Sequence, residues 1–243
     1  MPRYGGILGK RNKYSTFNKN GIWDISDQYS YAISPAESLS VVTNGLVLAL
    51  DAASPGPNPT TTWYDLSGGD RHFTWQSTPT YNTTNSGNYS LADGKGFYRL
   101  GAITNNTNCT LQMWIKTNDS NALWASGTDL ADVAGGSYIC AYNSGNVNGY
   151  HSGLGSPTAV VPTYFSNLSS VTNIYSTMTS GSTWRMIEFK NLDLSVWNNW
   201  KFNMYNGWNF DSGEIAGVYL YNRSLSSGES TSNFNALRGR YGI

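Results

Sequence analysis

The stretch VTNGLVLALDAASPGPNPTTTWYDLSG, residues 42–68, decides the fold class of this chain. Its first part alternates two apolar sets, with Leu46, Leu48 and Leu50 on one face and Val47 and Ala49 on the other. An extended segment that is apolar on both faces is typical of a strand covered on both sides. Four prolines and glycines at residues 55–59 then exclude regular structure.

The second part of the stretch predicts a return to the core followed by a tight turn. Trp63 and Tyr64 are expected to pack in the core, whereas Asp65 begins a turn through the small residues at 67–69. A new strand is expected at residues 72–76. We therefore interpret this cluster as structural rather than as a site.

Composition indicates one large β-rich globular domain. The chain has 243 residues, of which 39% are hydrophobic and 12% are charged. Sandwiches of this length often form a single domain. The 17 Tyr, 9 Trp and 8 Phe residues can still build a large core, because each aromatic side chain buries much area. Strongly disordered chains lack such residues.

Residues 1–40 differ from the rest and are interpreted as a separate N-terminal arm. Five of the 15 basic residues precede the first acidic residue, Asp24, which leaves 10 basic and 15 acidic residues after it. The apolar patch GIWDISDQY at 21–29 is too short to form its own core. We expect the arm to dock on a partner surface; the alternative is a tail packed on its own domain. The expected docking residues are Arg3, Lys10, Arg11, Ile22, Trp23, Ile25 and Tyr29.

Residues 41–243 alternate short apolar runs with turn signals, at the spacing of a sandwich. Residues 109–116 alternate two sets, Cys109, Leu111, Met113 and Ile115 against Thr110, Gln112, Trp114 and Lys116. Ser226 and Glu229 then have capping-box spacing, which predicts a short C-terminal helix. Phe234 and Leu237 would lie three residues apart on that helix, and Gly239 is placed to end it.

Several of these segments resemble the concanavalin A-like, laminin-G-like (LamG) jelly rolls of tailed-bacteriophage virion proteins. The resemblance covers residues 41–243 and is carried by GLVLALDA and TTWYDLSG near the start, CTLQMWIKT in the middle, and GEIAGVYLYNRSLSSGE and NFNALRGRYGI at the end. It implies an all-β fold, a two-sheet antiparallel jelly-roll sandwich of the concanavalin A-like lectin and glucanase type. GILGKRN and GIWDISDQY resemble the leader that opens many such virion proteins.

The acidic residues argue against an enzyme. Glycoside hydrolysis normally needs two facing carboxylates, and hydrolases of this fold carry Glu-x-Asp-x-x-Glu on one strand. The sequence has no such run, and its four glutamates are Glu37, Glu188, Glu214 and Glu229. Glu188 is expected to form a surface pair with Lys190, and Glu214 to be a strand-edge charge. His72 and His151 are distant in sequence, no Gly-x-Ser-x-Gly elbow is present, and both histidines are interpreted as structural.

No cofactor is expected, and metal binding has only weak candidates. Asp129 and Asp132 could offer two oxygens to calcium, as could Asp65 and Asp70, but neither pair has a diagnostic spacing. Solvated loop acids are the alternative. Cys109 and Cys140 lack metal-type spacing and are expected as small buried hydrophobes, with a disulfide between them left open.

The densest aromatic segment is VWNNWKFNMYNGWNF, residues 196–210, where aromatic rings are interleaved with asparagines. Such platforms suit carbohydrate recognition, the natural activity of this fold. The glycan-binding candidates are Trp197, Asn199, Trp200, Tyr205 and Trp208. The alternative is that these rings are core and hairpin aromatics.

The leading hypothesis is a non-enzymatic structural component of a tailed-phage virion, as a capsid decoration, tail fibre or other tail-associated subunit. The arm would anchor it to other virion proteins of the capsid or tail, in many copies or as a homo-oligomer. The alternative is an adhesin module that binds host surface polysaccharide. Nucleic-acid binding is not expected from five dispersed charges. Membrane insertion and a signal peptide are not expected either, because no long apolar run occurs.

Overall fold

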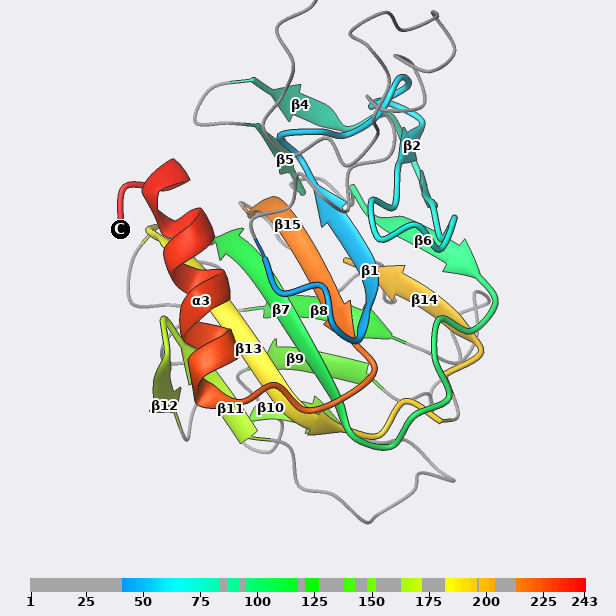
Figure 1. Ribbon diagram of the computed structural model, residues 1–243. Helices are drawn as coiled ribbons and strands as arrows, with labels where there is room; N and C mark the ends of the chain where they lie inside the picture. Colours follow the sequence, from blue (N-terminus) through cyan, green and yellow to red (C-terminus); the bar gives the residue numbers. More distant parts are fainter. Residues whose placement is uncertain are drawn as a thin grey trace, which may run out of the picture.

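The computed structural model describes residues 41–83, 87–91, 95–117, 121–126, 138–142, 148–151, 163–171, 182–195, 197–203 and 213–243 (Figure 1). The described strands form two sheets that face each other, with an α-helix on the outside of one of them. The expected N-terminal arm lies outside these residues.

Sheet A has eight strands in the order β12–β11–β13–β7–β15–β5–β4, and β1 is a further neighbour of β15. Their bounds are β1 Leu46–Asp51, β4 Thr80–Asn82, β5 Asn88–Ser90, β7 Cys109–Lys116, β11 Thr163–Ser166, β12 Ser169–Val171, β13 Trp184–Leu192 and β15 Glu214–Tyr221.

Sheet B has seven strands in the order β10–β9–β8–β14–β6–β3–β2. Their bounds are β2 Thr62–Trp63, β3 Phe73–Trp75, β6 Phe97–Leu100, β8 Asn121–Ser126, β9 Tyr138–Tyr142, β10 Asn148–His151 and β14 Asn199–Phe202. The described pairings are antiparallel in both sheets, for example β1 with β15 and β14 with β6. This confirms the expected fold class, a two-sheet antiparallel sandwich with a short C-terminal helix.

The strands at the two ends of the sandwich sequence lie side by side. Leu48 of β1 is opposite Leu220 of β15, and Leu50 is opposite Val218. All four side chains belong to the core between the sheets. The other face of β1 carries Ala49, which is also completely buried. The prediction that this strand is covered on both sides is therefore confirmed.

Strand β7 crosses the middle of sheet A and follows the predicted alternation. Cys109, Leu111, Met113 and Ile115 face the core between the sheets. Trp114 belongs to a second apolar cluster on the opposite face, where Thr110 and Gln112 are buried as well. Cys109 is a free, buried thiol, so it forms no disulfide with Cys140.

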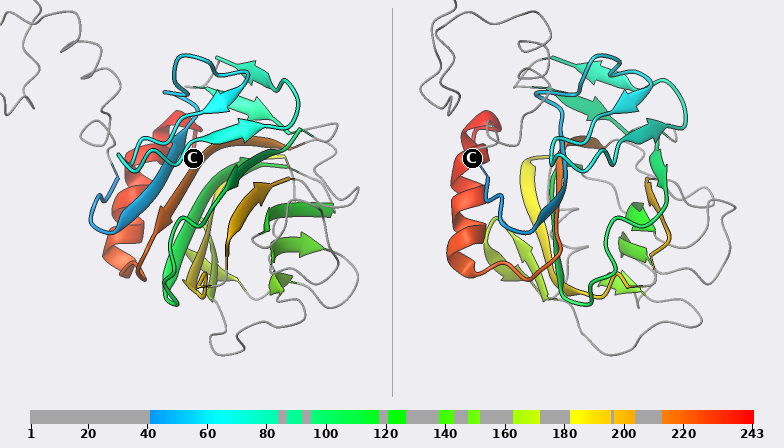
Figure 2. Two further views of the ribbon diagram at one scale, coloured as in Figure 1. Left: turned by 90° about the vertical axis from the view of Figure 1, so that its right-hand side faces the viewer. Right: turned by 45° about the vertical axis from the view of Figure 1, so that its right-hand side comes forward.

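The cover on the outer face of sheet A is the helix α3, Ser227–Leu237, followed by the 3₁₀ turn η2, Arg238–Arg240 (Figure 2). The predicted capping box is present, with the Ser226 side chain accepting from the Glu229 backbone. Phe234 stacks on Trp114 with ring centroids 5.8 Å apart. Gly239 does not end the helix as predicted, because the helix ends at Leu237 and Gly239 continues into η2.

Beneath α3 the outer face of sheet A carries buried polar side chains. The Gln112 amide donates to Glu188 at 2.5 Å and accepts from Asn233 of the helix at 2.8 Å. Ser230 of the helix also donates to Glu188, at 2.8 Å. These bonds satisfy polar groups that would otherwise be costly to bury, and they fix the helix on the sheet.

The same layer corrects the expectation of a surface pair at Glu188 and Lys190. Their charged groups are 3.4 Å apart, and the two residues are only 1% and 8% exposed. The Lys190 ammonium also donates to the Leu225 carbonyl oxygen at 2.9 Å. The prediction failed because α3 covers the face that the alternation pattern assigned to solvent.

The core between the sheets is largely aromatic. Trp63 stacks on Trp75 at 5.8 Å between centroids and meets Phe97 edge to face at 5.2 Å. Trp63 is completely buried, as predicted. Tyr64 is not a core residue, because it is half-buried and packs on the His72 ring at 4.6 Å. The remaining aromatic rings of this core are Phe73, Tyr89, Phe189, Trp197, Trp200 and Phe202.

The free edge of β1 is closed by the turn that follows β2. The Asp65 carboxylate accepts from the Ala49 backbone N–H at 3.0 Å, and the Leu66 N–H donates to the Ala49 carbonyl at 2.7 Å. The Arg71 guanidinium donates to the Val47 carbonyl at 2.9 Å. Asp65 was expected only to form the turn. Its carboxylate also accepts a hydrogen bond from the free backbone edge of β1, an edge that could otherwise pair with another chain.

We predict that Asp65→Asn lowers the free energy of unfolding by about 2 kcal/mol. The amide retains one oxygen but places an NH₂ group against N–H donors that the buried carboxylate now satisfies. Urea unfolding followed by tryptophan fluorescence measures the change. Asp70→Asn is the matched control, since Asp70 is exposed and should change stability by less than about 0.5 kcal/mol. Equal effects of the two substitutions would contradict the role given to Asp65.

Candidate functional site

The structure places Trp197 and Trp200 inside the protein. Both are completely buried, and their rings meet edge to face with centroids 4.6 Å apart. Trp200 also stacks on Phe202, at 6.2 Å between centroids. A fully buried ring cannot offer its face to a sugar, so the glycan-binding role expected of these two tryptophans does not hold. They are core aromatics, which was the alternative interpretation.

Asn199 is the one other predicted glycan contact within the described residues. It is half-buried at the start of β14, and its side-chain oxygen accepts from the Gly101 N–H at 3.1 Å. Tyr205 and Trp208 lie outside the described residues, as do Asp129, Asp132 and the docking residues Arg3, Lys10, Arg11, Ile22, Trp23, Ile25 and Tyr29. The predictions for these residues stay predictions.

The glutamates in the described part of the chain are each held by a basic side chain. Glu214 pairs with Lys116 at 2.8 Å and Glu229 pairs with Arg223 at 2.6 Å, while Glu188 has the buried contact with Lys190 described above. Burial raises the pKa of the Cys109 thiol to about 12, so this sulfur stays protonated at neutral pH. These groups are arranged as structural contacts rather than as a nucleophile with a base.

The described residues contain neither a cluster of metal-ligating side chains nor a helix that could span a membrane. Within them, no group of three or more His, Cys, Asp or Glu side chains is placed to hold a metal ion. Asp65, a weak candidate, already accepts four hydrogen bonds from the protein, from the Ala49, Ser67 and Arg71 backbone and from the Ser67 hydroxyl. None of the described helices has the length and apolarity needed to span a bilayer.

An open depression lies where the β6–β7 connection meets the segment that follows β15. Its volume is about 340 Å³, within the range of about 300–1,000 Å³ that ligand sites occupy. Four consecutive residues of the first connection and two of the second line it: Asn105, Asn106, Thr107, Asn108, Asn222 and Arg223. We call this depression the asparagine pocket.

Asn106 ties the two sides of the asparagine pocket together. Its amide donates to the Asn222 carbonyl at 2.6 Å, which joins the two connections. Its own carbonyl accepts from the Leu194 N–H at 3.0 Å and from the Cys109 thiol at 3.4 Å. Residues from three separate parts of the chain therefore hold this loop in one conformation.

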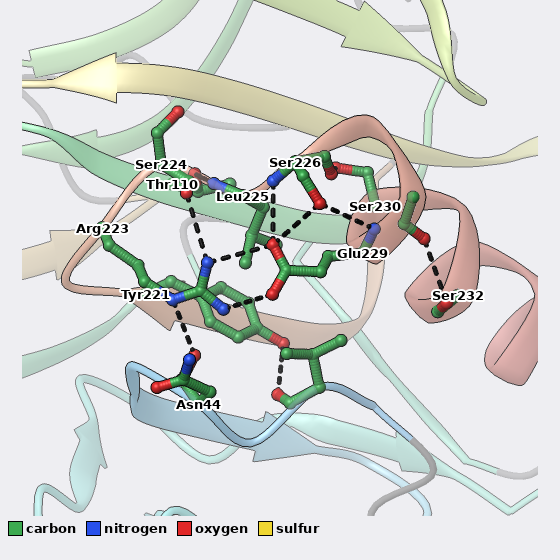
Figure 3. Close-up of polar contacts among 12 residues, drawn as sticks. Asn44, Thr110, Tyr221, Arg223, Ser224, Leu225, Ser226, Glu229, Ser230 and Ser232 are labelled. Carbon is green, nitrogen blue, oxygen red and sulfur yellow. Dashed lines mark hydrogen bonds and ion pairs between the residues drawn. The ribbon is translucent and has the colours of Figure 1, made fainter.

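Another lining residue, Arg223, forms what we call the arginine clasp (Figure 3). Its guanidinium donates to both carboxylate oxygens of Glu229, at 2.6 and 3.0 Å, and to the Asn44 carbonyl at 3.0 Å. Gly45 has φ +78°, and a Cβ added there would lie 2.9 Å from the guanidinium, so glycine leaves room for the clasp. The hydrogen bonds from Arg223, and then those from Ser226, lower the pKa of Glu229 to about 2.

Four side chains around the asparagine pocket have no hydrogen-bond partner among the described residues. Asn105, Thr107 and Asn108 are exposed, and Asn222 is half-buried. An asparagine amide carries two donors and one acceptor group, and a threonine hydroxyl both donates and accepts. The pocket therefore presents neutral, two-way hydrogen-bonding groups on a rigid backbone. This chemistry suits a neutral ligand rich in hydroxyl groups.

Sequence reasoning missed the asparagine pocket. Nothing local indicates that Asn222 lies beside the asparagines of the first connection. Asn106 and Asn222 are 116 residues apart. The available signal was the run NNTN at 105–108, which has more hydrogen-bonding side chains than a turn requires.

No family model and no curated protein matches this sequence. Solved structures do resemble its fold. The binding domain of botulinum neurotoxin serotype D aligns with 80% of this chain and 52% of its own length, at 13% identity and a TM-score of 0.51. The receptor binding domain of botulinum neurotoxin mosaic serotype C/D aligns with a TM-score of 0.51 and 13% identity, covering 80% of this chain and 51% of its own.

A Trypanosoma rangeli sialidase, solved with the inhibitor DANA, aligns with 90% of this chain and 41% of its own length, at 12% identity and a TM-score of 0.51. This chain thus spans about half of the neurotoxin domains, or less than half of the sialidase. At such identities the likeness shows the fold, a sandwich shared by binding domains and by part of an enzyme.

We predict that Glu229→Gln removes part of the acid sensitivity of the fold. Because the pKa of Glu229 is lowered in the folded state, its ionised form contributes stability above its ordinary value of 4.5. That contribution is lost as the pH falls from about 4.5 towards about 2. The melting temperature of Glu229→Gln should therefore lie below that of the wild type at pH 7 and approach it near pH 2.5, as differential scanning fluorimetry can measure. Asp70→Asn is the control, and a constant difference across this pH range would contradict the role of the clasp.

Proposed function

We propose that this protein is a non-enzymatic, glycan-binding module and that the asparagine pocket is its sugar site. The observation that carries the proposal is the set of four unpartnered side chains, Asn105, Thr107, Asn108 and Asn222, around a preformed depression. A site built to hydrogen-bond hydroxyl groups discriminates strongly against ligands that lack them, because its polar groups are then left unpaired. A pocket held by the arginine clasp also loses little freedom on binding.

The fold supports the same proposal. The sandwich is shared with the binding domain of a botulinum neurotoxin and with part of a sialidase, and this chain has no facing pair of free carboxylates in its described part. Since no described aromatic ring lines the pocket, one site should bind weakly, with a dissociation constant on the order of 1 mM. Useful binding would then come from several copies displayed together.

We predict that Asn105→Ala, Asn108→Ala and Asn222→Ala each abolish glycan binding without lowering the melting temperature by more than about 2 °C. The protein should be presented as a streptavidin tetramer on a glycan array of bacterial surface polysaccharides, because multivalency raises the signal of a weak site. Asn235→Ala is the matched control, since Asn235 is exposed on α3. Binding that survives all three substitutions would place the sugar site elsewhere, and a wild-type protein without any binding would refute the function.

We further propose that the module is displayed on a tailed-phage virion, as a decoration, fibre or tail-associated subunit. The support is the resemblance of the sequence to LamG virion proteins and the basic arm, with the docking residues Arg3, Lys10, Arg11, Ile22, Trp23, Ile25 and Tyr29. Anchoring to a particle would also supply the many copies that a weak sugar site needs.

Deletion of residues 1–40 should prevent incorporation into particles while the sandwich still folds. The reason is that the described members of both apolar clusters all come from residues 41–243. Incorporation is measured by mass spectrometry of purified particles, and folding by the melting temperature of the free protein. A truncated protein that enters particles at the wild-type level would show that the arm is not the anchor.

A further inference from the structure

The turn that leads into β1 has the dipeptide Asn44–Gly45 at its two central positions. The Leu46 N–H donates to the Thr43 carbonyl at 3.1 Å, which closes the turn. Gly45 has φ +78°, a conformation that a type II turn requires at its third residue and that favours glycine. The turn therefore needs glycine at this position, and an asparagine directly precedes it.

This turn holds the chain segment after β15 that lines the asparagine pocket. The Gly45 carbonyl accepts from the Asn222 N–H at 2.9 Å. The Asn44 carbonyl accepts from the Arg223 Nε–H at 3.0 Å (Figure 3). Asn222 and Arg223 both line the pocket. Two consecutive carbonyl groups of the turn thus position two consecutive residues of the pocket, so a change in the backbone of the turn also displaces the pocket.

The dipeptide is susceptible to a spontaneous reaction. The backbone nitrogen that follows an asparagine can attack the side-chain amide carbon, and glycine obstructs this approach least because it has no side chain. Asn44 is exposed, and among the described residues its side chain forms no hydrogen bond. Within the same part of the chain, the Gly45 N–H donates none either. Neither reacting group therefore has such a bond to lose before the attack.

We propose that Asn44 is a site of spontaneous deamidation and that isoaspartate formed there loosens the arginine clasp. The Gly45 nitrogen forms a bond to the Asn44 Cγ. The bond from this carbon to the amide nitrogen breaks, and ammonia leaves with the Gly45 proton. Water then opens the resulting succinimide ring at either of its carbonyl groups, which gives aspartate or isoaspartate. Water is the one co-reactant, and no group is oxidised or reduced.

The two products differ in their effect on the turn. Aspartate keeps the backbone as it is and adds a charge to an exposed side chain. Isoaspartate routes the chain through the former side-chain carbon, so the backbone gains a methylene group and the carbonyl that accepts from Arg223 becomes part of a free carboxylate. The lengthened turn no longer holds Asn222 and Arg223 at their present spacing. Isoaspartate therefore destabilises the fold, whereas aspartate does not.

The first test compares two Asn–Gly pairs within the same full-length protein. Asn148–Gly149 lies in β10, where both residues pair with β9. Folded protein is kept in mildly alkaline buffer at physiological temperature, and tandem mass spectrometry of its peptides follows aspartate and isoaspartate at each site. Asn44 should convert at least about fivefold faster than Asn148, because paired strands open rarely. In urea the two sites should convert at similar rates, since the chain is then equally free at both.

The second test measures the stability of the product. The fraction with isoaspartate at residue 44, separated by ion exchange, should melt about 3 °C lower than fresh protein or more, since the turn loses hydrogen bonds. Asn44→Asp is the matched variant, because it has the charge without the extra methylene group, and it should melt within about 1 °C of the wild type. Asn44→Gln, which would need a larger ring to react, should not show the drop after the same incubation.

The proposal is overturned if Asn44 converts no faster than Asn148 in the folded protein, or if the isoaspartate form melts as the wild type does. It is also overturned if Asn44→Asp melts as low as the isoaspartate form, because charge alone would then explain the loss. The inference rests on the arginine clasp and not on sugar binding. A blank glycan array would therefore refute the proposed function and leave this modification site standing.

Discussion

The sandwich depends on one carboxylate that stands in for a missing strand. Among the described strands, β1 pairs with β15 only, which leaves its other edge free. Asp65 and Leu66 fill this edge by taking one N–H group and one carbonyl of Ala49, as a neighbouring strand would. The same carboxylate orders its own turn through Ser67. The buried Asp65 carboxylate therefore occupies a backbone N–H group on the free edge of β1 and also orders the turn that follows β2. Few backbone groups of this edge then remain to pair with a second chain.

A second constraint follows from the helix on the outer face of sheet A. Because α3 and η2 bury that face, its polar side chains must find partners inside the protein. Gln112, Glu188 and Asn233 do so across the interface of strand and helix. The helix is also tied to the start of the sandwich, since the Val42 N–H donates to Asn233 at 2.7 Å. The helix is therefore an integral layer of the fold and positions the arginine clasp beside the asparagine pocket.

Features encoded by neighbouring residues could be predicted from the sequence. The alternation in β7 and the capping box at Ser226 depend only on residues a few positions apart, and both are present. Features that depend on what covers a face were missed. Lys190 has the pattern of a surface residue, but it is buried and its ammonium contacts Glu188, the Phe165 ring and the Leu225 carbonyl just before α3. The second role of Asp65 was missed because its partner Ala49 lies 16 residues away.

The candidate site was the least predictable part, because it depends on contacts between residues that are distant in sequence. An aromatic segment rich in asparagine suggested a sugar platform, but Trp197 and Trp200 complete the core instead. The asparagine pocket arises from two loops that only the fold brings together.

The pairing of β1 with β15 has a consequence for how the protein is made. Hydrogen bonds join residues up to 191 positions apart, as in the contact between Val42 and Asn233. A ribosome therefore releases β1 long before the strand beside it and the helix above it exist. Until then the apolar faces of β1 and β7 have no cover, and such intermediates fold slowly and aggregate readily. A product cut short before β15 would lack the strand that pairs with both β1 and β7 at the centre of sheet A.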